Sequence, residues 1–163
     1  MLDTPQVTFP AGARMHPSLR LLTWHPHGLL DATLADEILR FIDAEEGAVG
    51  EPFDRFTDLS GLRAVRLSVH EVEEIASRRV ARYHGAPVKS AILAFSPFDF
   101  GIARMYEQLM RQSPIEVRVF CRLSSASKWL NVPIEVLASE RAAASPAPSS
   151  PSPSPSSSAS PAE

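Results

Sequence analysis

The residue types and spacing that could carry regulatory chemistry occur at Ser68 and Glu71. They are three positions apart, which is the spacing of a capping box, where each side chain accepts a hydrogen bond from the backbone amide of the other residue. A phosphate on Ser68 would also be favoured there, because a helix start offers free amides and a positive dipole end, and Arg63 or Arg66 could attract the charge. Ser68 is therefore predicted to be a helix N-cap, and it is the candidate regulatory or partner-binding residue.

The histidines do not form a recognisable ligand set. His25 and His27 flank Pro26, but no nearby Cys or acidic residue completes a metal-binding spacing, so we interpret them as surface turn residues. His70 and His84 fall at opposite ends of a predicted helix, too far apart to act directly on one substrate. We predict no metal site and no catalytic histidine.

A basic cluster, Arg78, Arg79 and Arg82, could bind an anion. The same segment begins with three glutamates between positions 71 and 74. A helix dipole favours acidic residues in the first turn and basic residues in the last turn. Spacing of four residues also allows pairs such as Glu74 with Arg78. The cluster is therefore interpreted as a solvated helix face.

Recognisable enzyme motifs are lacking. Cys121 has no sequence-adjacent base and is expected to serve packing at a strand end. The chain contains no phosphate-binding glycine loop, Gly-x-Ser-x-Gly elbow or His-Glu-x-x-His sequence. We predict that the protein is not an enzyme and holds no cofactor.

Composition limits the partners and the compartment. The 163 residues include 44% hydrophobic and 21% charged ones, which suits a single globular core. A formal net charge of -3 gives no general attraction to nucleic acid or anionic lipid. No apolar run approaches the roughly 18 to 20 residues that span a bilayer. One cysteine and a start without signal-peptide features indicate a cytoplasmic protein.

Three regions follow from the distribution of residues. Residues 1–10 are expected to be a loosely ordered N-terminus, and residues 11–135 to form one α/β domain. Residues 136–163 are expected to be a disordered tail, because this end of the chain is rich in Ser, Pro and Ala and has few large apolar side chains to offset the entropy of ordering.

Apolar spacing and turn residues predict the elements of the domain. A hairpin is expected from Arg14 to Trp24, with its turn at His16-Pro17-Ser18. Strands are then predicted at 53–59, 88–95 and 115–120, the second of them buried in mid-sheet. Helices are predicted at 32–46, from Ser68, at 98–112 and after Ser124. Asp31 is the expected cap of the first helix. The expected buried stripe of the second helix consists of Val72, Ala76, Val80 and Tyr83. The order is ββαβαβαβα, which favours parallel neighbours joined by crossovers.

This order, the segment 100–106, the strand ending Val117–Phe120 and the later Ala126 and Trp129–Leu130 resemble the STAS-like family. Specifically, the chain is similar to small bacterial STAS/SEC14-type (SpoIIAA-like) proteins related to sporulation anti-sigma-factor antagonists. The resemblance implies a mixed sheet of four or five strands with helices packed on it. It also implies either phosphorylation-controlled partner binding or lipophilic-ligand binding, without catalysis.

In the phosphorylation-controlled branch of that family, an Asp-Ser pair stands at the start of the second helix. Here Ser68 matches the serine, whereas Leu67 replaces the acid, a departure that counts against the switch. Asp58-Leu59-Ser60-Gly61 resembles the end of the preceding strand.

Two functions follow as expectations. The first is a non-enzymatic cytoplasmic interaction or regulatory module of STAS-like type, with an unidentified protein partner. The alternative is a binder or carrier of a small lipophilic ligand, motivated by Phe95, Phe98, Phe100 and Met105, which could equally be simple core. The sequence leaves the partner, the ligand and the oligomeric state open.

Overall fold

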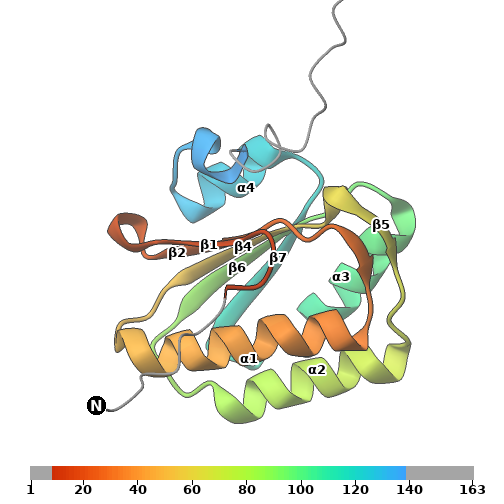
Figure 1. Cartoon of the computed structure of the whole chain (residues 1–163), viewed down its shortest axis with the longest axis horizontal. Coiled ribbons are helices and arrows are strands. Elements are labelled where there is room, and N and C mark those ends of the chain that lie inside the picture. The colour runs from red at the N-terminus through yellow and green to blue at the C-terminus, as the bar shows by residue number, and fades with distance from the viewer. Residues whose placement is uncertain (1–8, 139–163) are drawn as a thin grey trace, which may run out of the picture.

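The computed structural model describes residues 9–138, which form three layers around a central sheet (Figure 1). Three helices lie on one face of the sheet and the fourth lies on the other. The strands are β1 (Ala13–His16), β2 (Leu21–Trp24), β3 (Gly28–Leu30), β4 (Asp54–Asp58), β5 (Leu62–Val65), β6 (Val88–Leu93) and β7 (Ile115–Phe120). The helices are α1 (Ala32–Val49), α2 (Val69–Arg82), α3 (Pro97–Leu109) and α4 (Leu123–Leu130).

The main sheet has five strands in the order β1-β2-β4-β6-β7. β1 pairs antiparallel with β2, and the three remaining pairs are parallel. β6 lies between β4 and β7 and is almost entirely buried, which confirms the predicted central strand. The expected α/β class with a mixed sheet and helices packed on it is confirmed.

Strand periodicity divides the sheet residues between two cores. Because successive side chains point to opposite faces, Leu22 and Ile92 join the core under α1, α2 and α3. Leu21, Phe56 and Leu93 join the second core under α4, and each of these three is fully buried. The face under the three helices also carries the site described below.

Two helices, α1 and α2, begin at their predicted caps. The Asp31 carboxylate accepts a hydrogen bond from the Leu34 amide at 3.0 Å, and α2 begins at the predicted Ser68. α1 continues three residues beyond the predicted position 46, so Gly47 lies inside it. The helix ends at Gly50, whose φ of 67° is a left-handed conformation that glycine adopts without steric cost.

Other details correct the predictions. The short strands β3 and β5, which were not predicted, pair in parallel as a separate two-stranded sheet. The buried stripe of α2 includes Arg79 in place of Val80, which is 39% exposed. α4 has Arg122 at its N-cap and contains Ser124 inside its first turn, so the predicted serine cap is wrong.

The second core extends past the predicted domain end at residue 135. Leu137 is fully buried, and the 2.8 Å hydrogen bond between its carbonyl oxygen and the His25 Nε2 ties this segment to the end of β2. The remaining residues of the expected tail and most of the expected loose N-terminus lie outside residues 9–138. Within the described range, no helix combines the length and apolar character needed to cross a membrane.

Candidate functional site

A cavity of about 150 Å³ lies between the sheet and the helices α1, α2 and α3. Most of its lining is aliphatic or aromatic. It includes Leu22 and Trp24 of β2, Leu30 of β3, Ile38 and Leu39 of α1, Val72 and Ile75 of α2, Ile92 of β6, Ile102 and Ala103 of α3, and Leu59 and Leu67 of the connecting segments. A void of this size lined by such groups can hold a molecule the size of benzene.

A buried arginine lines the cavity from the centre of the sheet. Arg55 lies on β4, and only 7% of its side chain is exposed. Its guanidinium carbon is 5.0 Å from the centroid of the Phe53 ring and 5.4 Å from that of Tyr83. Nη2 donates to Glu46, but Nε and Nη1 are buried and have no hydrogen-bond partner among residues 9–138. Such donors are costly when they stay unsatisfied, so this guanidinium requires an acceptor from outside the described part of the chain.

A second buried arginine approaches the same carboxylate from α2. Arg79 has 3% of its side chain exposed and donates from Nη2 to Glu46 and from Nη1 to Asp43, both at 2.6 Å. Arg82 donates to the second oxygen of Asp43 at 2.8 Å. Three guanidinium groups therefore share two carboxylates of α1; those of Arg55 and Arg79 are buried, whereas the Arg82 side chain is 57% exposed.

The two buried arginines respond differently to their surroundings. Burial lowers the pKa of Arg55; Glu46 opposes this shift and the Arg79 charge reinforces it. Burial also acts to lower the pKa of Arg79, but the hydrogen bond and charge of Glu46, with Tyr106 and Asp43, outweigh it and the pKa is raised. Glu46 accepts two hydrogen bonds from Arg79 and one from Arg55.

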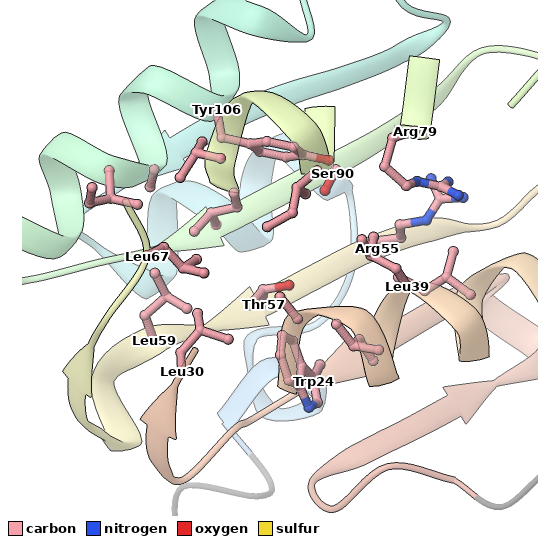
Figure 2. A pocket seen from close by; sticks show the side chains of 18 of the residues that line it. Trp24, Leu30, Leu39, Arg55, Thr57, Leu59, Leu67, Arg79, Ser90 and Tyr106 are labelled. Carbon is pink, nitrogen blue, oxygen red and sulfur yellow. The ribbon is translucent and has the colours of Figure 1, made fainter. Parts of the chain in front are cut away.

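Hydroxyl groups add polar character to one part of the cavity. Tyr106 of α3, Ser90 of β6 and Thr57 of β4 all line it. Burial raises the pKa of the Tyr106 hydroxyl, so this group is a neutral hydrogen-bond donor at ordinary pH. Figure 2 shows the guanidinium groups of Arg55 and Arg79 at one end of the cavity and Leu30, Leu59 and Leu67 toward the other. The cavity is therefore polar at one end and apolar at the other.

Ion pairs also join α1 and α2 above the cavity. Asp36 of α1 accepts one hydrogen bond from Arg78 of α2, and its other oxygen lies 2.8 Å from the Nε of Arg40. The Arg78 bond lowers the pKa of the Asp36 carboxyl, with burial opposing the shift. Leu39 and Ile75 line both the cavity and a surface groove between these helices, so they stand at its outer boundary.

Ser68 lies away from the cavity lining. Its Oγ accepts a hydrogen bond from the Glu71 amide at 3.2 Å, and its own amide donates to the Glu71 carboxylate at 2.7 Å. The predicted capping box is therefore confirmed. The side chain is exposed, and its regulatory or partner-binding role stays a prediction.

Several sequence interpretations are corrected by the positions of the side chains. His25 is buried rather than a surface turn residue, although His27 is exposed. Arg78 pairs with α1 instead of Glu74, and Arg79 is buried, so the basic cluster is not a solvated face. Cys121 is exposed, so its expected packing role is wrong.

The phenylalanine-rich segment does not line the cavity. Phe95 and Phe98 are 51% and 61% exposed, and neither they, Phe100 nor Met105 is among the lining residues. A simple core role for Phe95 and Phe98 is therefore wrong, whereas a ligand contact by this segment stays a prediction. The cavity lies instead beneath α1 and α2.

Sequence reasoning missed Arg55 and the acids of α1. One usable signal was present, because Phe53, Arg55, Thr57 and Leu59 occupy alternate positions and so share one face of the strand. Since Phe53 and Leu59 belong to the core, the charged residue between them had to be buried with them. Glu46 and Asp43 carried no comparable signal, because their partners lie on other elements, the helix α2 and, for Glu46, also the strand β4.

The protein is thus an α/β domain with a five-stranded mixed sheet and a cavity beneath three helices. Among solved structures, it is similar to an uncharacterized DUF3478 family protein from Shewanella loihica PV-4, described as having a SpoIIAA-like fold. The two share 16% sequence identity with a TM-score of 0.45, over 68% of this chain and 83% of the other. No family model matches the sequence. No curated protein matches it either.

Proposed function

We propose that this protein binds a small lipophilic molecule in the cavity between the sheet and helices α1, α2 and α3, as a non-enzymatic carrier or sensor. The observation that carries the proposal is the cavity of about 150 Å³ with its largely aliphatic lining. Close-packed interiors contain few voids larger than a water molecule, and an apolar void gains contacts when an apolar molecule fills it.

Binding is favoured over catalysis by the polar groups that face this cavity. They are guanidinium and hydroxyl groups, and the lining residues place no histidine, cysteine or carboxylate there to act as a base or nucleophile. Such groups orient a ligand within an apolar site. The proposal places the protein in the cytoplasm, where a reducing environment suits the free, exposed Cys121.

The proposal is tested by titrating the full chain with toluene and following the methyl resonances of the lining residues by NMR. The wild type should bind toluene, and Ala103→Leu should abolish binding, because Ala103 lines the cavity and the larger side chain would fill it. Ala81→Leu is the matched control, since Ala81 is an exposed residue of α2. Failure of the wild type to bind, or equal binding by Ala103→Leu, would contradict the proposal.

Partner binding is the second candidate function, corresponding to a regulatory or interaction module. It is favoured by Phe95 and Phe98, because large exposed aromatic side chains beside one another in sequence are typical of interaction surfaces. A native mass spectrum of the protein isolated from its own source separates the two functions. A bound small molecule supports the carrier, whereas a stoichiometric protein partner released by Phe98→Ser supports the module.

A further inference from the structure

We infer that the ligand of this cavity is a small carboxylate, whose anionic group binds Arg55 while its apolar body fills the space between the sheet and the helices. This inference rests on the proposed function and names the class of ligand. Three observations carry it: unsatisfied donors, two cationic lining residues without an acidic one, and the separation of polar and apolar lining.

The unsatisfied donors belong to a rigidly surrounded group. The Arg55 guanidinium lies against the Phe53 and Tyr83 rings and donates to Glu46, so its place is set by contacts on several sides. Nε and Nη1 are both buried, and within the described part of the chain nothing accepts a hydrogen bond from them. A ligand with an oxygen acceptor at this end of the cavity would satisfy them, and a carboxylate does so with charge-assisted hydrogen bonds.

The charges of the lining favour an anion with a single negative charge. Two lining residues, Arg55 and Arg79, are cationic and none is acidic, while the third arginine of the cluster, Arg82, is 57% exposed, so solvent screens its charge. A carboxylate would bring one negative charge to this end of the cavity, whereas a phosphate dianion would bring two into a place with little water. Buried charges persist in proteins when they are paired and hydrogen-bonded.

The shape and polarity of the cavity select the rest of the molecule. Tyr106 and Ser90 offer hydroxyl groups near the arginines, and Figure 2 shows Leu59 and Leu67 lining the space away from them. A volume of about 150 Å³ suits a body of roughly six to nine non-hydrogen atoms, the size range of benzene and slightly larger molecules. Hexanoate and benzoate have this size and charge.

The test compares hexanoate with 1-hexanol, and benzoate with benzyl alcohol, by calorimetric titration of the full chain. Each pair has the same apolar body and differs in its anionic group. The carboxylates should bind at least about tenfold more tightly than the alcohols, since hydrogen bonds to charged groups are the stronger kind. Arg55→Met should remove this preference and leave the alcohols bound, because Arg79 still holds Glu46. Arg78→Met is the matched control, since Arg78 pairs with Asp36 outside the lining and should keep the preference.

The titrations distinguish failure of the carboxylate inference from failure of the proposed lipophilic site. Equal binding of carboxylates and alcohols by the wild type would overturn the carboxylate and leave the lipophilic site standing, whereas failure of all four probes would overturn both. If Arg55→Met does not fold, arginine labelled with ¹⁵N in the wild type gives the same answer. The Arg55 Nε resonance should shift with hexanoate and not with 1-hexanol, and an unchanged resonance at saturating hexanoate would contradict the inference.

Discussion

At the first turn of α2, the side chains of Ser68 and Glu71 each accept a hydrogen bond from the backbone amide of the other residue. Ser68→Ala should therefore lower the free energy of unfolding by about 1 kcal/mol, whereas Ser68→Asp should preserve it, because Asp caps a helix about as well as Ser. Denaturant unfolding of the three forms measures this difference. Equal stability of the Ala form would contradict the capping role.

The regulatory role of Ser68 gives a separate signature. If the serine is only a cap, the Ser, Ala and Asp forms should bind any captured partner equally, because the exposed side chain then contributes only to its own helix. Several-fold weaker or tighter binding by the Asp form alone, with an unchanged melting curve, would instead indicate a charge-controlled contact.

Glu71 gives this cap a dependence on pH. The hydrogen bond from the Ser68 backbone amide lowers the pKa of the Glu71 carboxyl below its ordinary value. Because the folded-state pKa is the lower one, the stabilisation is complete above the unfolded pKa of about 4.3 and is lost as pH falls through the folded value. The stability difference between the wild type and Glu71→Gln, which keeps a capping box without a charge, should shrink over that acidic range. A difference that stays constant from neutral to acidic pH would contradict this linkage.

Between the elements, the ion pairs of Glu46 hold α1 against α2 and β4. Glu46→Ala should lower the free energy of unfolding by about 3 to 5 kcal/mol, because it leaves buried guanidinium charge without its partner. Asp36→Ala is the matched control, since its partners Arg78 and Arg40 are much more exposed, and it should destabilise the fold far less. An equal loss of unfolding free energy in the two variants would show that the buried ion pairs of Glu46 stabilise the fold no more than the exposed pairs of Asp36.

The elements themselves could be predicted largely from local signals. Asp31 and Ser68 mark two helix starts, and the apolar run at 88–95 marks the central strand, because caps and burial patterns depend on neighbours in the sequence. β3 and β5 were missed because they are short and pair with each other outside the main sheet, and no local pattern in the sequence indicates that pairing.

The site was less predictable for a physical reason. Glu46 meets Arg79 across 33 positions, and this pairing depends on how two helices pack rather than on spacing within either. Arginines in the last turns of a helix that begins with glutamates have the pattern of an ordinary solvated face. The burial of Arg79 depends on the packing of α1 against α2 and has no signal within α2 itself.

For the whole molecule, the second core should end at Leu137. A chain that ends after Ala138 should keep the thermal midpoint of the full chain within about 5 °C, because the packed residues of the described core are all retained. A chain that ends after Glu135 loses Leu137, which is fully buried, and should melt well below it. Thermal unfolding of the three chains checks both statements, and a large loss in the longer truncation would show that later residues support the fold.

The cavity beneath α1 and α2 also makes hydrostatic pressure a sensitive variable for this protein. A void of about 150 Å³ corresponds to about 90 mL/mol, and unfolding allows solvent to fill part of it, so the unfolded state occupies less volume. Compression should therefore favour unfolding of the empty protein. High-pressure fluorescence should give a volume change of unfolding that is clearly negative for the wild type and smaller in magnitude for Ala103→Leu, or for the wild type saturated with hexanoate. The cavity that binds a ligand would then also determine how strongly pressure destabilises the folded state. A bound ligand would reduce this sensitivity to pressure.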